Sequence, residues 1–441
     1  MDPIDVMARY EDRTARSREL YGRARRSIAG GTTRSSVWFE PYPLYAASGE
    51  GCRIVDADGV ERIDCIGNYS ALVLGHRHPA VLAAIAAQLE RGTAFSAPSE
   101  REVELAELLC ERLASVERVR FTSTGTEATM YAMRVARAAT GRTVVARFEG
   151  GYHGTHDFAQ VSTHPDLAAA GDPRRPSAVA DGPGIPPRVL EMTLVLPFND
   201  LEGAKVLLAE RAADVAAVIV EPVMGSCGCI PAEEGFLEGL REITRELGML
   251  LIFDEVISLR LGYGGAQGVY SIEPDLTTMG KIIGGGLPVA AFGGSADLMG
   301  IVDPEAPVTM EQAGTYNGNP LGTAAGAATM RELTPTAVER LNAAGETLRT
   351  ELREVFAAHE LDVQIVGMGS ILAVHFTNGP VRNYRDVAGA DGELLGRFVI
   401  GMMNEGIFLA PRGMMALCTP MTDGDLAQVV RATDRVAAEL A

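Results

Sequence analysis

Lys281 is the residue of this chain best suited to chemistry on a carbonyl group. Lysines are rare here, because only Lys205 and Lys281 occur among the 39 lysine and arginine residues. Lys281 stands between the polar run 275–280 and three consecutive glycines, 284–286. An amine can lose its proton and attack a carbonyl carbon to form a Schiff base, whereas a guanidinium stays protonated. We therefore interpret Lys281 as a candidate nucleophile, with an ordinary surface lysine as the alternative.

Two apolar, strand-like runs end in carboxylates, Val218–Glu221 and Leu251–Asp254. In an open parallel sheet, ligands bind beyond the carboxyl ends of the strands. A carboxylate at that edge is partly desolvated and needs a cation or an N–H group as its partner. A protonated pyridine nitrogen would satisfy Asp254, although a helix cap or a salt bridge could explain either carboxylate.

The run Ser123-Thr124-Gly125-Thr126 follows a strand-like segment and precedes a helical one. A helix N-terminus presents N–H groups without partners, and hydroxyls and a glycine let a phosphate approach them. An ordinary N-cap by Thr124 or Thr126 is the alternative. Neither a P-loop nor a Gly-x-Gly-x-x-Gly fingerprint is present, because Ile282 follows Lys281 where a P-loop has Ser or Thr.

The segment Gly150-Gly151-Tyr152-His153-Gly154 places an aromatic residue among glycines after another predicted strand. Tyr152 could stack on a planar ring, or it could simply pack on the surface of a turn. His153 and His156 are spaced for zinc, but no third ligand follows in a recognisable pattern, so we predict no metal.

Taken together, these features describe a single ligand. They offer a phosphate site at 124–126, a planar surface at Tyr152, a carboxylate for a ring nitrogen at Asp254 and an amine for an aldehyde at Lys281. Pyridoxal 5′-phosphate (PLP) has all four groups, and we predict it as the cofactor.

Short Val- and Ile-rich runs alternate with helical patterns from about residue 116 onward. We expect strands at 118–122, 144–148, 193–196, 217–221, 250–256 and 289–292. This alternation predicts an α/β fold with a mostly parallel central sheet covered by helices. We predict three parts: residues 1–65 (a helix over 1–28, a loop and a hairpin) and 326–441 together form a smaller α/β domain, and 66–325 form the large cofactor-binding domain.

The overall composition excludes several classes of protein. The net charge is −19 and the pI is near 4.9, which argues against binding to nucleic acid or to an anionic membrane. No apolar run is long enough to cross a bilayer, and the first residues lack the pattern of a signal peptide. The six scattered cysteines predict reduced thiols, and we expect a cytoplasmic protein.

From Gly30 onward the chain resembles the class III aminotransferases of fold type I, and especially their glutamate-1-semialdehyde aminomutase-like branch. The motifs that carry the resemblance are Leu74–Pro79, Ser123–Thr129, Phe148–Gly154, Ile219–Pro222, Asp254–Val256, Pro274–Val289 and Gly314–Pro320. The block around Lys281 is the most specific of them.

The resemblance implies a role for each matching residue. Lys281 would form the Schiff base with PLP and move the proton, and Asp254 would keep the pyridine nitrogen protonated. Val256 and Tyr152 would pack on the two ring faces, and Glu221 would lie near the cofactor.

Thr124, Gly125 and Thr126 would hold the phosphate of the cofactor. Thr315 would contact it from the neighbouring subunit, because the family forms homodimers with shared active sites.

Arg34 and Arg412 are the candidate residues for binding a substrate carboxylate, since a guanidinium fork matches a carboxylate through two hydrogen bonds. With Ser258-Leu-Arg260-Leu after Asp254, they resemble aminotransferases of β-amino acids such as β-phenylalanine. We therefore expect amino transfer between a β-amino or similar non-α amino acid and a 2-oxo acid.

Three alternatives stay open. They are a glutamate-1-semialdehyde 2,1-aminomutase, an amino-acid racemase or epimerase on the same scaffold, and a non-catalytic binding protein. The presence of both Lys281 and Asp254 argues against the last of these.

Overall fold

The structure is a computed structural model that describes residues 6–441, and the chain divides into two compact units. Unit 1 contains the residues up to 79 together with 340–380 and 389–441, and unit 2 contains 80–339 and 381–388. The predicted domain limits at 65 and 325 stay a prediction. The predicted helix over residues 1–28 lies partly outside the described residues. Its described part contains two helices, α1 (Val6–Arg13) and α2 (Ala15–Ala24).

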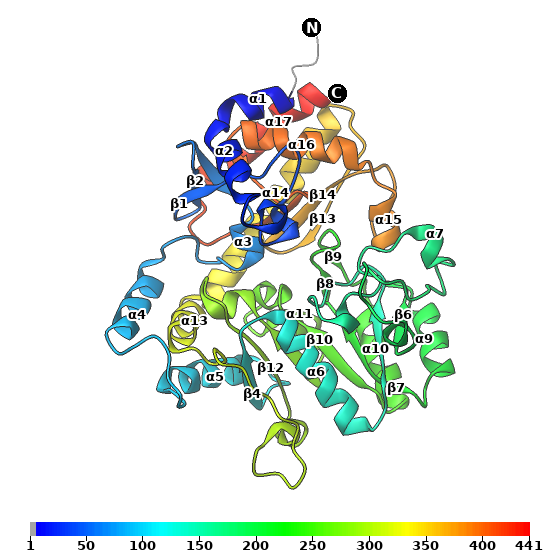
Figure 1. Ribbon diagram of the computed structural model, residues 1–441. Helices are drawn as coiled ribbons and strands as arrows, with labels where there is room; N and C mark the ends of the chain where they lie inside the picture. The colour runs from blue at the N-terminus through cyan, green and yellow to red at the C-terminus, as the bar shows by residue number, and fades with distance from the viewer. Residues whose placement is uncertain (1–5) are drawn as a thin grey trace. The chain divides into compact units, whose positions relative to one another are not determined.

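A seven-stranded sheet forms the centre of unit 2 (Figure 1), with the strand order β4-β12-β11-β10-β7-β5-β6. Its strands are β4 (Arg118–Thr122), β5 (Val144–Phe148), β6 (Thr193–Leu196), β7 (Val215–Val220), β10 (Leu250–Asp254), β11 (Leu276–Met279) and β12 (Ala290–Gly294). Only β12 runs antiparallel to its neighbours. The prediction of a mostly parallel sheet in an α/β fold is confirmed.

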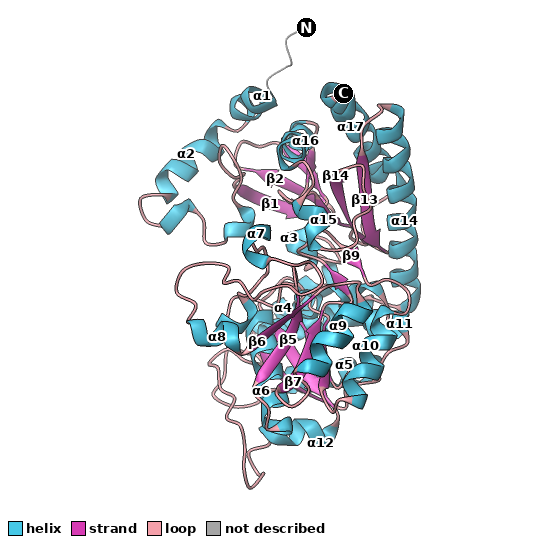
Figure 2. Cartoon of the chain, turned by 90° about the vertical axis from the view of Figure 1, so that its right-hand side faces the viewer, coloured by secondary structure: helices cyan, strands magenta, loops and turns pink. Residues whose placement is uncertain are grey.

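Helices cover this sheet, as the cyan ribbons beside the magenta strands in Figure 2 show. The helices of unit 2 are α4 (Pro79–Leu89), α5 (Glu100–Arg112), α6 (Gly125–Thr140), α7 (Leu167–Ala170), α8 (Pro187–Glu191), α9 (Leu201–Glu210), α10 (Phe236–Glu246), α11 (Gly265–Tyr270), α12 (Ala296–Met299), α13 (Pro320–Glu332) and α15 (Tyr384–Ala388). A two-stranded ribbon adds β8 (Val223–Met224) and β9 (Ile230–Pro231).

Helix α6 packs along the middle of the sheet and organises its core. Its buried apolar side chains, including Tyr131 and Val135, contact Ile219, Ile252 and Phe292 of three strands. Because side chains alternate along a strand, the neighbours of these residues face the opposite side, and β7 is buried at every position.

The strand β11 was not predicted from the sequence, and this is a correction. We described 275–280 only as a polar run before Lys281. The hydroxyls of Thr277 and Thr278 are instead buried, and they find hydrogen-bond partners on Gln267 and Asp254. The strand therefore brings Lys281 to the same edge of the sheet as Asp254.

Unit 1 contains two smaller sheets. The first has the order β1-β2-β3-β15 and the second is the antiparallel β13-β14-β16. Its elements are α1 (Val6–Arg13), α2 (Ala15–Ala24), β1 (Ala46–Glu50), β2 (Arg53–Asp56), β3 (Glu61–Asp64), α3 (Gly67–Ser70), β13 (Val363–Met368), β14 (Ile371–Phe376), α16 (Gly392–Asn404), β15 (Ile407–Phe408), β16 (Met414–Ala416) and α17 (Asp423–Leu440). Helix α14 (Pro335–Ala358) begins in unit 2 and continues into unit 1. A smaller α/β unit built from both ends of the chain is as predicted.

No helix within residues 6–441 is long and apolar enough to span a membrane.

Candidate active site

Lys281 lies in a tight turn directly after β11. Its φ is 48°, and Gly285, which follows the short 3-10 helix Lys281–Gly284, has a φ of 57°. A non-glycine residue rarely adopts a positive φ unless the surrounding structure holds it there. The side chain is partly buried, and burial lowers the pKa of its amine, although the charges of Asp254 and Glu221 partly oppose this effect. The turn thus fixes an amine whose protonated form is disfavoured.

Val256 joins the lysine turn to the start of α6. A Cβ atom added to Gly125 would lie 3.2 Å from a Val256 methyl group, and one added to Gly280 would also lie 3.2 Å from Val256. Such contacts are tighter than usual, so both positions favour glycine. Gly125 at the start of α6 and Gly280, the residue before Lys281, therefore both pack against Val256.

The N-terminus of α6 has the features of an anion site. Thr124 is the N-cap, and its hydroxyl accepts the N–H of Glu127 at 3.2 Å. The first N–H to bond a carbonyl along the helix belongs to Ala128, so the N–H groups of Gly125 and Thr126 precede the helical ladder. The Thr124 side chain is a cap, as the alternative interpretation held. An anion could still bind the N–H groups of this partly buried first turn.

Tyr152 is held beside this helix by its own loop. Its N–H donates to Glu221 Oε1 at 2.8 Å. Three residues further on, the N–H of Thr155 donates to the Thr126 hydroxyl at 3.2 Å, and Gly154 lies against the Thr126 backbone. Tyr152 itself is 38% exposed.

Asp254 ends β10 and is buried with three hydrogen-bond donors. Oδ2 lies 2.8 Å from His153 Nδ1, while Oδ1 accepts from the Val256 N–H at 3.1 Å and from the Thr278 hydroxyl at 3.0 Å. Three donors from three segments fix the orientation of the carboxylate and offset part of its desolvation.

Glu221 follows β7 and shares this small region with the other charged groups. Burial, together with the nearby charge of Asp254, raises its pKa to about 8, despite the N–H groups of Tyr152 and Gly225 and the charge of Lys281. Two buried carboxyl groups and an amine at one edge of a sheet, with burial shifting the pKa of Glu221 and of Lys281, are typical of a functional site.

The comparison with known protein families agrees with this geometry. A family model described as aminotransferase class-III matches residues 35–430. This chain belongs to the class III aminotransferases.

Several known proteins are similar to this aminotransferase over almost their whole length. A glutamate-1-semialdehyde 2,1-aminomutase of Methanothermobacter thermautotrophicus is 44% identical over 90% of this chain and 92% of its own. An omega-transaminase structure from Sphaerobacter thermophilus has a TM-score of 0.93 and 44% identity, covering 96% of this chain and 97% of the other. A β-phenylalanine aminotransferase structure from Variovorax paradoxus has a TM-score of 0.89 and 36% identity, covering 98% and 95%.

The cofactor of this aminotransferase is PLP. A transaminase structure with PLP bound has a TM-score of 0.90 and 36% identity, covering 97% of this chain and 98% of the other. The residues of this chain fit the cofactor. Val256 packs against Gly125 at the helix N-terminus and against Gly280, the residue before Lys281, and its N–H donates to the buried Asp254 carboxylate.

Three further residues were predicted to bind the cofactor or the substrate. Arg34 and Arg412 belong to unit 1, where the charges of both act on the Tyr69 hydroxyl, so the two arginines share one neighbourhood. The Arg34 guanidinium donates to Asn68 Oδ1 at 2.8 Å. Thr315 is exposed and forms no hydrogen bond within residues 6–441.

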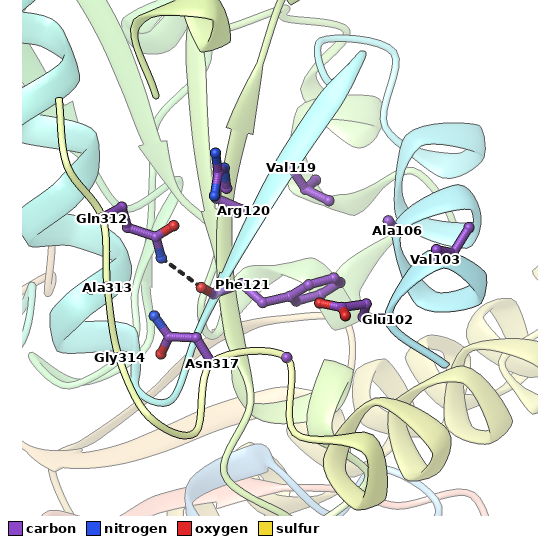
Figure 3. A pocket seen from close by; sticks show the side chains of 11 residues that line it. Glu102, Val103, Ala106, Val119, Arg120, Phe121, Gln312, Ala313, Gly314 and Asn317 are labelled. Carbon is purple, nitrogen blue, oxygen red and sulfur yellow. Dashed lines mark hydrogen bonds between the residues drawn. The ribbon is translucent and has the colours of Figure 1, made fainter. Parts of the chain in front are cut away.

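A pocket of about 520 Å³ opens beside β4, the edge strand of the sheet (Figure 3). Figure 3 shows Phe121 pointing toward α5, and Gln312 Nε2 donates to the Phe121 carbonyl at 2.8 Å. The lining of this pocket contains none of the residues predicted to bind the cofactor or the substrate. The pocket is lined by Glu102, Val103, Ala106, Val119, Arg120, Phe121, Gln312, Ala313, Gly314, Asn317 and Gly318.

Sequence reasoning missed His153 as the partner of Asp254. We considered it only as a zinc ligand, but its Nδ1 bonds a carboxylate, and no group of His, Cys, Asp and Glu in residues 6–441 is arranged to hold a metal. A signal was available, since His153 directly follows Tyr152 in a glycine-bounded turn.

Proposed function

We propose that Lys281 is the catalytic residue of this enzyme and that it reacts with the PLP aldehyde and transfers the substrate proton. Bound PLP supplies an electron sink that stabilises negative charge on the substrate carbon. The observation that carries this proposal is that Lys281 follows β11 at the sheet edge where Asp254 ends β10 and Glu221 follows β7, and that burial lowers the pKa of the Lys281 amine. A lowered lysine pKa favours the neutral amine, which is the form that attacks a carbonyl and accepts a proton.

The same proposal assigns the remaining cofactor contacts. Asp254 keeps the pyridine nitrogen protonated, and Val256 and Tyr152 cover the faces of the ring. The first turn of α6, residues 124–126, binds the phosphate. Glu221 orients the loop of Tyr152 by accepting the hydrogen bond of the Tyr152 N–H.

The proposed substrate is a carboxylic acid whose amino group is not on the α carbon. The first candidate reaction is the 2,1-aminomutase reaction, because the Methanothermobacter relative bears that name at 44% identity. In glutamate-1-semialdehyde the amino group adjoins the aldehyde and lies away from the free carboxylate. The reaction would move the nitrogen within one substrate.

A second candidate is amino transfer between a β-amino acid and a 2-oxo acid. It is supported by the omega-transaminase at 44% identity over 96% of this chain and by the β-phenylalanine aminotransferase at 36%. Arg412 and the sequence Ser258-Leu-Arg260-Leu also favour it. Both candidates require recognition of a distant carboxylate.

A nitrogen-labelling experiment separates the two reactions. The PLP-loaded enzyme is given either ¹⁵N-labelled glutamate-1-semialdehyde or ¹⁵N-labelled β-phenylalanine, with and without 2-oxoglutarate. An aminomutase isomerises the first substrate without an acceptor and keeps the label in the same carbon skeleton. A transaminase delivers the label to the oxo acid and needs it in stoichiometric amounts. If neither donor reacts under either condition, the proposed substrate class is wrong.

We further propose that Arg34 and Arg412 bind the substrate carboxylate. Both are exposed, and both act on Tyr69, so two guanidinium groups concentrate positive charge in one part of unit 1. Such a pair suits a carboxylate better than a single lysine would.

The enzyme is proposed to be a homodimer in which Thr315 of one subunit reaches the phosphate site of the other. The pocket beside β4 supports a second copy as its occupant, because an open edge strand is normally covered. Val103 and Tyr316, which are 52% and 64% exposed, add apolar surface nearby. Light scattering should give twice the mass of one chain; the mass of a single chain would contradict the proposal.

We also propose that the enzyme works in a reducing compartment such as the cytoplasm. The six cysteines form no disulfide in the structure, which agrees with reduced thiols. Fractionation of cells that express the protein would test this, and recovery outside the cytoplasm would contradict it.

A further inference from the structure

Arg147 is a fully buried arginine with no obvious role in the proposed chemistry. It lies on β5 with 0% of its surface exposed, and burial lowers its pKa to about 10. Asp181, Glu221 and Asp254 favour its charge, but none of these carboxylates accepts a hydrogen bond from it in the described chain. A buried charge without a contacting counter-ion is costly, so its location calls for an explanation.

The guanidinium of Arg147 donates mainly to backbone carbonyls of the loop that carries Tyr152. Nη1 donates to the carbonyls of Phe158 and Ala159, and Nη2 donates to the Gly151 carbonyl and to the Thr163 hydroxyl. Hydrogen bonds from a charged donor are among the stronger ones in proteins. The side chain therefore ties both ends of the 151–163 loop to the sheet.

One of these carbonyls belongs to the peptide bond that joins Gly151 to Tyr152. The C=O of this peptide accepts from Arg147, and its N–H donates to Glu221 Oε1 at 2.8 Å. Arg147 lies on β5 and Glu221 directly follows the neighbouring parallel strand β7, because Arg147 is paired with Ile219, two residues before Glu221. A single peptide unit is thus held from one side by a cation and from the other by a carboxyl group.

This double attachment matters because the surrounding backbone is soft. Gly150, with a φ of 85°, and Gly151 precede Tyr152, and glycine permits conformations that other residues avoid. Without attachments, the peptide could rotate and turn the Tyr152 ring away. Arg147 and Glu221 supply the rigidity that the glycines remove.

We propose that Arg147 is a positioning residue for Tyr152, and that with Glu221 it fixes the Gly151–Tyr152 peptide and hence the direction of the Tyr152 ring. The inference rests on the proposed function, in which Tyr152 covers one face of PLP. It adds a residue that has no contact with the cofactor in that proposal.

The test measures PLP binding to the cofactor-free protein by absorbance and by the circular dichroism that the protein induces in bound PLP. Arg147→Met should raise the PLP dissociation constant about tenfold, as expected for losing a charge-assisted hydrogen bond, and should weaken the induced signal. Arg147→Lys should recover part of both. Because Met could prevent folding, Arg147→Gln is measured alongside it and should show the same change.

Arg142→Met is the matched control. Arg142 also donates to backbone carbonyls, those of Val215, Leu247 and Gly248, but β7 begins at Val215 and β10 begins soon after Gly248, so it serves the opposite end of the strands. This variant should leave the PLP dissociation constant unchanged. An equal loss of binding in Arg142→Met would reduce Arg147 to a general structural role and overturn the inference.

A double-mutant comparison distinguishes this inference from the proposed function. Tyr152→Ala should weaken PLP binding, and adding Arg147→Met to it should change the dissociation constant less than twofold further. A full tenfold further loss would show that Arg147 does not act through Tyr152 and would overturn the inference alone. Unchanged binding in Tyr152→Ala would instead overturn the proposed place of Tyr152 and the inference with it.

Discussion

His153 Nδ1 lies 2.8 Å from Asp254 Oδ2, and both side chains are almost completely buried. Burial lowers the pKa of His153, although the hydrogen bond and charge of Asp254 oppose this. Burial thus favours the neutral imidazole, which donates to the carboxylate through Nδ1. A neutral donor fixes the orientation of the carboxylate without cancelling its charge. Asp254 therefore keeps its negative charge for the pyridine nitrogen in the proposed site.

Replacing this imidazole should weaken the enzyme through Asp254. His153→Phe keeps an aromatic ring but removes the donor, and we expect kcat/KM to fall about 10- to 100-fold, since a hydrogen bond to a charged group contributes about 1.5–3 kcal/mol. His156→Phe is the control, because His156 contacts the Thr129 hydroxyl and not Asp254. Steady-state kinetics measure both, and equal losses in the two variants would contradict the assignment.

The two lysines permit a direct chemical test of Lys281. Borohydride reduction of the PLP-loaded protein should attach the mass of the cofactor to the peptide that contains Lys281. Lys281→Met should show no attachment, no visible absorbance band of a lysine-linked cofactor and a loss of activity of at least about a thousandfold. Lys205→Met, a change at an exposed position of α9, should behave like the unchanged protein. Cofactor mass on the Lys205 peptide would refute the role of Lys281.

Glu221 should make the stability of the cofactor-free protein depend on pH. Its pKa is raised from 4.5 to about 8 by burial, so the folded state holds this proton more tightly than the unfolded chain does. The stabilisation is complete below about pH 4.5 and is lost as the pH rises toward 8. Glu221→Gln lacks this loss, so its free energy of unfolding relative to the unchanged protein should rise by about 3.5 kcal/mol between pH 5 and pH 8.

Urea unfolding at pH 5, 6.5 and 8 measures this difference. Glu202→Gln, at an exposed position of α9, is the control and should show no trend with pH. A constant difference between Glu221→Gln and the unchanged protein at all three pH values would show that Glu221 does not retain its proton in the folded state.

Replacing Arg34 or Arg412 should affect the KM only of substrates that have a carboxylate. Arg34→Gln and Arg412→Gln are each expected to raise the KM of such a substrate about 10- to 100-fold, because a charge-assisted pair is lost. An amine of the same size without a carboxylate should react as before. Arg26→Gln changes another exposed arginine of unit 1 and serves as the control. If the KM of the neutral amine rises equally, carboxylate binding is not the role of these residues.

Much of the sheet follows from local sequence patterns. The strands predicted at 118–122, 144–148 and 193–196 have those limits in the structure, because short β-branched runs bounded by turns are informative by themselves. The strand β11 could not be recognised in this way. Its two threonine hydroxyls are satisfied by Gln267 and Asp254, which belong to other segments, and a local pattern does not contain such partners.

The sequence by itself determined the chemistry that is available. A nearly unique lysine, two carboxylates at strand ends and a glycine-rich helix start indicate an amine, a partner for a ring nitrogen and a phosphate site, because these properties belong to the residue types. Only the tertiary structure decided which groups meet. His153 and Asp254 are 101 residues apart, and Arg147 and Glu221 hold one peptide from two strands, because parallel strands joined by crossovers bring distant segments to one edge.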